Sequence, residues 1–179
     1  MNPAPNLVLV GPMGAGKSSL GRRVAGQLGL DFVDADRRIE QQAGASIALI
    51  FEHEGEAGFR AREEKMLAEL LGERGLAIAT GGGAVLSPST REGLRTRAFV
   101  VHVQVGIEQQ LARLERDHAR PLLAQGDRRE TLARLAQLRD PLYAEVADLV
   151  FASDGMAVDD AARRLAAQLA QHWQRSEAA

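Results

Sequence analysis

Short apolar runs alternate along this chain with longer amphipathic stretches. Apolar runs of this length, bounded by polar residues and glycines, predict buried strands, and they are Leu7–Val10, Phe32–Val33, Leu76–Ala79, Phe99–Val103 and Leu149–Phe151. Between them apolar residues recur at helical spacing, as Ile107, Leu111 and Leu114 do. The predicted helices are Lys17–Leu28, Ser46–His53, Glu56–Leu71, Ile107–Arg116, Arg128–Arg139 and Val158–His172.

This alternation of strands and helices predicts an α/β fold with a parallel sheet covered on both faces. Ligands of such sheets bind beyond the carboxyl ends of the strands, so a motif that directly follows a strand is a candidate site. The length of 179 residues suits one domain over residues 1–179.

Composition narrows the class of protein. Hydrophobic residues make up 45% and charged residues 26%, as in ordinary globular proteins. The chain has no cysteine, which excludes disulfides, thiolate zinc sites and cysteine nucleophiles. The early apolar run Leu7–Val10 is far shorter than the roughly 20 residues of a membrane-spanning helix, and nothing basic precedes it as in a secretory signal. We therefore expect no membrane partner and a cytoplasmic location.

The charged residues of the chain limit its partners and single out one lysine. The formal charge of −2 argues against a general nucleic-acid partner, which usually needs a basic surface. Lysine occurs only at Lys17 and Lys65, whereas the other 20 of the 22 basic residues are arginines. A single arginine therefore carries little functional information, whereas Lys17 carries more.

A phosphate-binding loop follows the first predicted strand and opens the first predicted helix. Residues 11–18 read Gly-Pro-Met-Gly-Ala-Gly-Lys-Ser and satisfy the pattern at every required position. Glycines let successive N–H groups point at phosphate oxygens, and the helix N-terminus adds partial positive charge. The alternative is a glycine-rich turn without a ligand. The candidate ATP-binding residues are Gly14, Ala15, Gly16, Lys17, Ser18 and Ser19, with the Ser18 hydroxyl also a candidate ligand of Mg²⁺.

Two carboxylates follow the second predicted strand. In a strand-like stretch, Asp34 and Asp36 would point the same way and face one site. Carboxylates accept hydrogen bonds from sugar hydroxyls, and one of them can take a proton or position water bound to Mg²⁺. The alternative is a solvated acidic turn that caps a helix around residues 37–41.

Two further segments suit an anionic acceptor. Arg60 and Glu63 are three residues apart on a predicted helix and can pair, which would hold the guanidinium as a rigid fork for a carboxylate. The alternative is an ordinary surface pair. Gly81, Gly82 and Gly83 follow the third strand, where glycines allow close approach of the backbone. The alternative there is a flexible left-handed turn, for which one glycine would suffice.

The polar stretch between the fourth and fifth predicted helices suits a mobile cover over residues 113–125. Arg113 and Arg120 lie in it, the latter before Pro121, and closure would exclude water from the site. An ordinary connecting loop is the alternative. Arg139 ends a predicted helix before proline, where it could bind a carboxylate or cap the helix end. We interpret the single tyrosine, Tyr143, as a packing residue.

In this order and spacing, the motifs resemble the shikimate kinase family over roughly residues 7–150. The residues that carry the resemblance are Gly11–Ser18, Asp34-Ala35-Asp36, Ser46-Ile47, Ile50-Phe51-Glu52, Gly55-Glu56, Phe59-Arg60 with Glu63, Gly81–Gly83, Arg120-Pro121-Leu122-Leu123 and Arg139–Tyr143. The phosphate loop occurs in many families, whereas the double Asp, the glycine triplet and the Arg-Pro-Leu-Leu segment together are much more selective.

The resemblance implies a P-loop NTPase three-layer sandwich with a five-stranded parallel sheet, like that of nucleoside monophosphate kinases. It also implies transfer of a phosphoryl group from MgATP to the 3-hydroxyl of shikimate by a monomer, with residues 34–63 as the substrate-binding segment. By analogy, shikimate binds Asp36, Arg60, Arg139 and the Gly81–Gly83 backbone. The catalytic residues are Lys17, Asp34 and Arg120; ATP also contacts Arg113 and Arg120; and Mg²⁺ lies at Ser18 and Asp34.

One segment departs from the family. After the last strand the family often has an Asp-Thr-Asn-Arg-like sequence beside the adenine, whereas residues 152–156 here read Ala-Ser-Asp-Gly-Met without a nearby arginine. Two other functions share some of these motifs. A gluconate-type kinase shares the loop and an anionic polyol acceptor. A nucleotide switch would lack acceptor chemistry, and a GTPase is excluded because neither lysine lies in an Asn-Lys-x-Asp motif. With no cysteine and no Ser–His arrangement, we expect direct in-line transfer.

Overall fold

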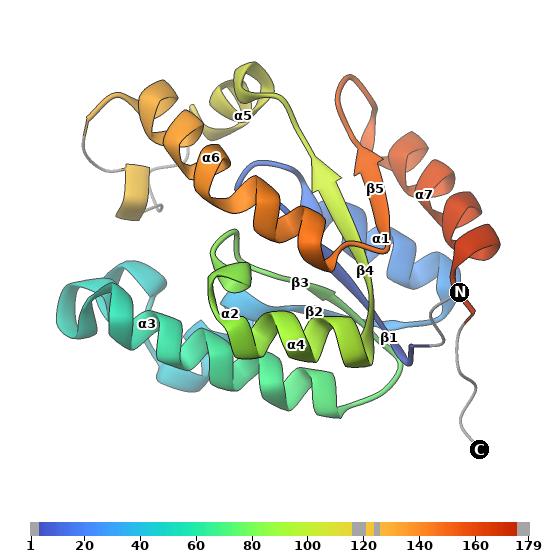
Figure 1. Cartoon of the computed structure of the whole chain (residues 1–179), viewed down its shortest axis with the longest axis horizontal. Helices are drawn as coiled ribbons and strands as arrows, with labels where there is room; N and C mark the ends of the chain where they lie inside the picture. Colours follow the sequence, from blue (N-terminus) through green and yellow to red (C-terminus); the bar gives the residue numbers. More distant parts are fainter. Residues whose placement is uncertain (1–3, 116–120, 124–125, 175–179) are drawn as a thin grey trace.

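A five-stranded sheet forms the centre of the molecule (Figure 1). The computed structural model describes residues 4–115, 121–123 and 126–174. Its strands are β1 (Asn6–Val10), β2 (Asp31–Asp34), β3 (Leu76–Ala79), β4 (Ala98–Gln104) and β5 (Leu149–Ala152). They lie in the order β2-β3-β1-β4-β5, and every neighbouring pair is parallel. The predicted parallel sheet is confirmed, and each predicted strand lies inside one of these.

Helices connect the strands and cover the sheet. They are α1 (Lys17–Leu28), α2 (Ala35–Ala43), α3 (Ile47–Gly72), α4 (Pro88–Arg97), α5 (Ile107–Leu114), α6 (Arg128–Val146) and α7 (Val158–His172), with short 3-10 turns η1 (Ala84–Leu86) and η2 (Pro121–Leu123). The alternation of strands and helices gives the α/β fold expected from the hydrophobic pattern.

Both faces of the sheet are buried, and β1 shows how. Its side chains alternate between two cores. Leu7 and Leu9 pack in a cluster with residues of α1 and α7, whereas Val8 and Val10 pack with residues of α3, α4 and α6. Figure 1 accordingly shows α1 beside α7 and α3 beside α4. Three layers result, with β1 paired to β3 on one side and to β4 on the other.

The long helix α3 is broken at Gly55, between the two predicted helices Ser46–His53 and Glu56–Leu71. Gly55 has φ 69° and ψ −179°, which is far from helical. The Ser46 hydroxyl accepts a hydrogen bond from the Leu49 N–H at 3.2 Å and so caps the first segment. This break turns the second segment back along the sheet and places Arg60 near the strand ends.

Helices α2, α4 and α6 differ from the prediction, and α2 was expected only in the alternative of an acidic turn. Helix α4 was not predicted, although Ser87 caps it by accepting from the Thr90 N–H and Pro88 occupies its first turn. Helix α6 does not end at Arg139; it continues through Pro141 to Val146. A proline removes one helical hydrogen bond. Here the buried face formed by Arg139, Tyr143 and Val146 keeps the helix going, because packing outweighs that loss.

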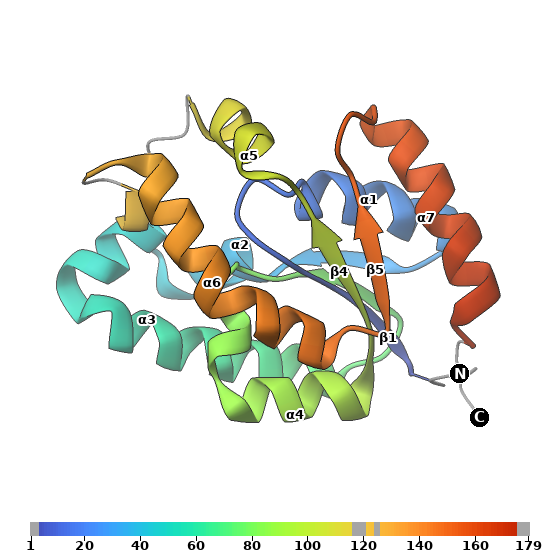
Figure 2. The same cartoon turned by 45° about the horizontal axis from the view of Figure 1, so that its top comes forward.

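Figure 2 shows α5 beyond the carboxyl end of β4, on the side where the loop between β1 and α1 lies. Predicted helix residue Arg116 and the predicted cover residue Arg120 lie outside the described residues. Within residues 4–115, 121–123 and 126–174, no helix is both long and apolar enough to cross a membrane.

Candidate active site

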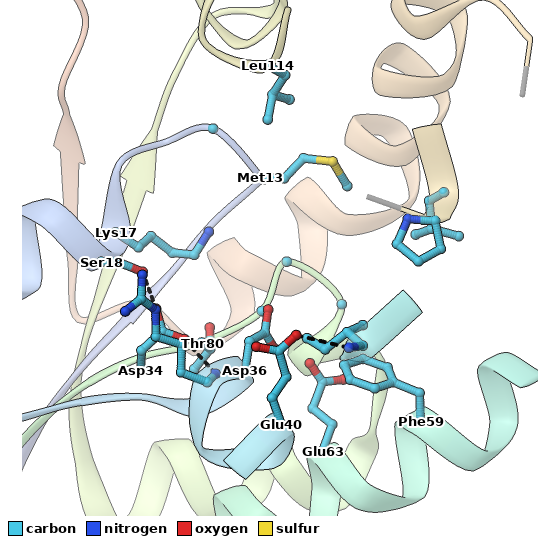
Figure 3. A pocket seen from close by; sticks show the side chains of 18 of the residues that line it. Met13, Lys17, Ser18, Asp34, Asp36, Glu40, Phe59, Glu63, Thr80 and Leu114 are labelled. Carbon is cyan, nitrogen blue, oxygen red and sulfur yellow. Dashed lines mark hydrogen bonds between the residues drawn. The ribbon is translucent and has the colours of Figure 1, made fainter. Parts of the chain in front are cut away.

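A cavity of about 510 Å³ opens at the carboxyl ends of the strands. Figure 3 shows Lys17, Ser18 and Asp34 on one side of it and Phe59 and Glu63 on the other. Most residues singled out from the sequence lie on its wall: Gly14, Gly16, Lys17, Ser18, Ser19, Asp34, Asp36, Arg60, Gly81, Gly82, Gly83, Arg113 and Arg139. Ala15 lines a smaller adjoining cavity of about 250 Å³. The cavity therefore joins the nucleotide loop to the expected acceptor residues.

The phosphate-binding loop has the backbone that its sequence predicts. Gly11 has φ +143°, and a Cβ there would lie 2.4 Å from the carbonyl oxygen of Val103, so only glycine fits. Gly16 caps α1 in the left-handed conformation. The Lys17 ammonium donates to the carbonyl oxygens of Gly11 and Pro12, each at 2.8 Å. The buried lysine is thus already held over the loop that would surround the phosphates.

Helix α5 supports this loop from outside. The buried Gln110 amide donates to the Met13 carbonyl oxygen at 2.9 Å, and Arg113 donates to the Gly14 carbonyl oxygen at 2.9 Å. Sequence reasoning found Arg113 and missed Gln110. Gln110 could have been recognised as a polar residue one turn after Ile107, on the apolar face of a short helix. These two bonds tie the loop to the start of the segment expected to act as a cover.

The two expected magnesium ligands lie together. The Ser18 hydroxyl donates to a carboxylate oxygen of Asp34 at 2.5 Å. Among the described residues no group of three or more histidines or acids could hold a metal by itself. Mg²⁺ requires no such group, since it is usually bound through one or two protein oxygens together with phosphates and water. The Ser18–Asp34 pair therefore fits Mg²⁺ as a partner of ATP.

Asp34 and Asp36 reach the cavity in a way that the sequence did not predict. They are not alternate residues of one strand, because α2 begins at Ala35. Asp34 caps this helix by accepting from the Arg37 N–H at 3.2 Å, and Asp36 lies in its first turn. The helix-capping alternative thus describes Asp34 correctly, yet both carboxylates line the cavity.

The predicted pair of Arg60 and Glu63 is present and is not an ordinary surface pair. Their side chains are 2.6 Å apart, and Glu63 is only 3% exposed. Glu56 lies on the outer side of the guanidinium, at 3.3 Å. Burial raises the pKa of Glu63, and the nearby Arg60 opposes that rise. The Arg60 Nε is buried without a hydrogen-bond partner among the described residues, whereas the side chain as a whole is 22% exposed and lines the cavity.

The glycine triplet is required by space and not by a left-handed turn, since none of its three residues has positive φ. A Cβ on Gly81 would lie 2.7 Å from Glu63 Oε1 and 2.9 Å from Asp36 Oδ1. A Cβ on Gly83 would lie 2.4 Å from the guanidinium of Arg60. The bare backbone lets the charged acceptor-side groups close over this turn. The flexible-turn alternative is therefore wrong.

Arg139 is 4% exposed and belongs to the interior of α6, so it caps no helix end. Burial lowers its pKa from the ordinary arginine value, and the neighbouring Tyr143 opposes this shift. An arginine remains charged in proteins. A buried guanidinium that lines the cavity is suited to bind an anionic group of a ligand.

Apolar side chains complete the acceptor half. Phe51 and Phe59 pack against each other with ring centroids 4.9 Å apart, and both line the cavity. Ile47 and Leu122 lie on the same wall. A ligand with one apolar face and several hydroxyl groups would match this mixture of rings, carboxylates and guanidinium groups.

The adjoining cavity lies beside the segment that departs from the family pattern. The Ser153 hydroxyl donates to the carbonyl oxygens of Ala15 at 3.2 Å and Gln104 at 3.3 Å. Asp154 accepts from the Gly106 N–H at 3.1 Å. These two side chains hold the loop in place, and Met156 contributes an apolar wall to the cavity. The loop therefore offers an apolar surface where the family often has an arginine.

A buried histidine beneath the site predicts a pH dependence of stability. Burial lowers the pKa of His102 from 6.5 to about 4, with a smaller contribution from Lys17, and its ring is 4% exposed. Unfolded chain binds this proton at higher pH than folded protein, so stability is lost as pH falls from about 6.5 towards 4. We expect this group to account for about 2 kcal/mol of unfolding free energy lost between pH 7 and pH 5.

Urea unfolding at both pH values checks this expectation. His102→Gln should reduce the loss of stability on acidification by that amount, whatever its stability at pH 7. His53→Gln is the matched control, because His53 is exposed. Equal pH dependence of the two variants would contradict the assigned role.

A family model and several relatives match nearly the whole chain. The family model described as shikimate kinase matches residues 13–170. Shikimate kinase of Stenotrophomonas maltophilia (strain R551-3) is 52% identical over 177 residues, 99% of this chain and 98% of that protein. Shikimate kinase of Xanthomonas campestris pv. campestris (strain 8004) is 50% identical over 176 residues, 98% of each.

Solved structures of shikimate kinases have the same fold as this chain. A shikimate kinase from Acinetobacter baumannii in complex with shikimate has a TM-score of 0.91 and 44% identity, over 94% of each chain. A gluconokinase from Sinorhizobium meliloti 1021 has a TM-score of 0.59 and 17% identity over 93% of each chain, which shows a shared fold alone. The P-loop fold of the nucleoside monophosphate kinase type, expected from the sequence, is confirmed.

Proposed function

This chain belongs to the shikimate kinase family, and from that premise we propose that it transfers the γ-phosphoryl group of ATP to the 3-hydroxyl of shikimate. The products are shikimate 3-phosphate and ADP, in the route to chorismate and the aromatic amino acids. The observation that carries the proposal is one cavity in which the phosphate-binding loop faces Arg60, Arg139 and the glycine triplet.

The nucleotide occupies the half of the cavity around the loop. Its phosphates lie against the backbone N–H groups of Gly14–Ser18 and Ser19, at the N-terminus of α1. Lys17 turns from the loop carbonyls towards the β- and γ-phosphates. The base lies in the adjoining cavity between Arg113 and Met156, which both line it. Ser18 and Asp34 would hold the Mg²⁺ of MgATP, and this ion would neutralise charge on the phosphate oxygens.

The acceptor occupies the other half. Its carboxylate lies between the guanidinium groups of Arg60 and Arg139, and its hydroxyls face Asp36 and the Gly81–Gly83 backbone. Support comes from burial and fixed geometry, since Glu63 holds Arg60 and both arginines line the cavity. A planar fork binds a carboxylate through two parallel hydrogen bonds, which also orients the ring.

Transfer is direct and in line. The chain's main contribution is alignment of the acceptor hydroxyl with the γ-phosphorus and positive charge around the transferred group. Lys17 supplies that charge from the loop, and on sequence grounds Arg120 adds to it from the segment outside the described residues. Asp34 is hydrogen-bonded to Ser18 on the nucleotide side of the cavity, and by analogy with the family it would lie close to the reacting hydroxyl. A loose transition state leaves little need for early removal of the proton.

A coupled assay of ADP formation tests the function. Purified protein with MgATP should consume ATP rapidly with shikimate and far more slowly with gluconate or with no acceptor. Preference for gluconate would favour the sugar-acid kinase alternative. Equal, low consumption in all three reactions would favour a nucleotide-binding module and overturn the proposal.

Substitution of Gly83 tests the acceptor half. Gly83→Ala should raise the KM for shikimate by about 10-fold or more, because the new Cβ would displace the Arg60 guanidinium that now lies 2.4 Å from its position. The KM for ATP should stay near that of the unaltered protein. Gly26→Ala is the control, since Gly26 lies within α1 with no atom within 4 Å of a Cβ. An unchanged shikimate KM in Gly83→Ala would remove Arg60 from the acceptor site.

Three finer features belong to the same proposal. Residues 1–179 act as one catalytic domain in which residues 34–63 bind the acceptor. The cover expected over residues 113–125 lies partly outside the described residues. We also propose that the enzyme works as a monomer, because the residues assigned to ATP and to the acceptor come together within one chain. Its place of action is the cytoplasm, where ATP is available.

A further inference from the structure

Tyr143 is a buried residue whose hydroxyl group packing alone does not require. It is the only tyrosine in the chain, and it is 1% exposed within the core cluster of α3, α4 and α6. A phenylalanine would fill the same space without a polar atom. A buried hydroxyl is unfavourable unless it is hydrogen-bonded, so its contacts indicate what it does.

The hydroxyl donates to the carbonyl oxygen of Gly82 at 2.5 Å. Gly82 lies where three segments meet. A Cβ placed on it would be 3.5 Å from the Tyr143 hydroxyl, 3.3 Å from Arg139 Nη1 and 3.4 Å from the Met13 backbone nitrogen. The middle of the glycine turn therefore touches α6 on one side and the phosphate-binding loop on the other.

The ring of Tyr143 is fixed from the opposite side. It packs against the His102 ring with centroids 5.0 Å apart. His102 lies on β4 directly beside Val10, the last residue of β1 before the phosphate-binding loop. The sheet thus anchors one end of the tyrosine next to the nucleotide loop, and its hydroxyl end reaches the acceptor turn.

Arg139 lies one helical turn before Tyr143 on the buried face of α6, and the two side chains interact. Burial raises the pKa of Tyr143 to about 12, although the Arg139 guanidinium opposes that rise. The hydroxyl therefore stays protonated, and remains a donor to Gly82, at any pH where the enzyme works.

We propose that Tyr143 is a positioning residue for the acceptor: its hydroxyl fixes the Gly81–Gly83 turn and the Arg139 guanidinium at a set distance from the phosphate-binding loop. This inference rests on the proposed function, because it assigns the turn and Arg139 to the acceptor. It replaces the interpretation of Tyr143 as packing alone. The residue touches neither substrate and acts through the groups that do.

Tyr143→Phe tests the proposal, since it removes one oxygen and keeps the ring. We expect the shikimate KM to rise about 5- to 30-fold while the ATP KM changes by less than about threefold, because the bond holds the acceptor groups and not the nucleotide-binding residues. Val146→Ala is the matched control. Val146 lies in the same helix and core cluster and lines no part of the cavity, so its truncation removes packing without removing a polar contact to the turn. Its shikimate KM should stay unchanged even where its melting temperature falls.

Hydrogen exchange gives a second readout that does not depend on activity. The Ala84 and Leu86 N–H groups bond to the carbonyl oxygens of Gly81 and Gly83, at 3.2 and 3.0 Å, and report on the turn. Their exchange should accelerate in Tyr143→Phe and not in Val146→Ala. Equal exchange in the two variants, or an unchanged shikimate KM in an active enzyme, would overturn the role of Tyr143. Failure of the unaltered protein to phosphorylate shikimate would overturn the proposed function instead, and the exchange comparison would still decide whether Tyr143 holds the turn.

Discussion

Replacing Lys17 by alanine is expected to lower kcat for shikimate phosphorylation by about 100- to 1,000-fold. The lysine is buried at the N-terminus of α1, and its ammonium group already lies 2.8 Å from two carbonyl oxygens of the loop. Little rearrangement is needed to bring this charge to the γ-phosphate. In a site from which water is excluded, a fixed positive charge stabilises the transferring group far more than it would in water.

The chain offers an unusually clean control for this prediction. Its only other lysine, Lys65, is exposed on α3, so Lys65→Ala removes the same type of side chain away from the cavity. Steady-state kinetics should show normal kcat for that variant. Circular dichroism should show that both variants are folded. Retention by Lys17→Ala of more than about a tenth of the normal kcat would contradict the electrostatic role.

Local parts of this molecule were predictable from sequence because their geometry is contiguous in the chain. The phosphate-binding loop, Gly11–Ser18, needs only a strand, a glycine-rich turn and a helix in succession, and all three are present. The same holds for the break in α3 at Gly55, which separates two stretches of helical periodicity. The pairing of Arg60 with Glu63 followed from helical spacing alone.

Elements whose limits depend on distant contacts were not predictable. A proline at position 141 suggested that a helix ends at Arg139. The helix nevertheless continues to Val146, because Tyr143 and Val146 are buried in the core. Asp34 and Asp36 were assigned to the right place for the wrong reason, since α2 begins between them. Short-range propensity yields to tertiary packing at such positions.

The contacts that fix the site are long-range, and they were missed for that reason. Gln110 lies 97 residues from the Met13 carbonyl that it binds, and Tyr143 lies 61 residues from Gly82. A single sequence identifies residue types that could act in a site, because chemistry restricts those types. It does not identify the side chains that hold them, because many polar or aromatic residues look equally suitable until the fold brings segments together.

Replacing Arg139 by alanine is expected to weaken shikimate binding by about 10- to 100-fold, the range for losing a buried hydrogen bond to a charged group. Arg139 is only 4% exposed, so in the alanine variant a cation from solvent cannot readily replace the lost charge. Binding of ATP should change little, because the nucleotide half of the cavity lies around Lys17 and Ser18. Calorimetric titration with each ligand measures both effects.

Two further variants test whether the planar guanidinium of Arg139, its charge alone or its position in α6 causes the effect. Arg139→Lys keeps a positive charge but loses the planar pair of donors, so its shikimate Kd should lie between those of the unaltered protein and Arg139→Ala. Arg134→Ala removes an exposed arginine from the same helix and should leave both Kd values unchanged. An unchanged shikimate Kd in Arg139→Ala would remove this residue from the acceptor site. Equal weakening of ATP and shikimate would instead assign it to the folding of α6, because a residue of the acceptor half alone should affect shikimate and spare ATP.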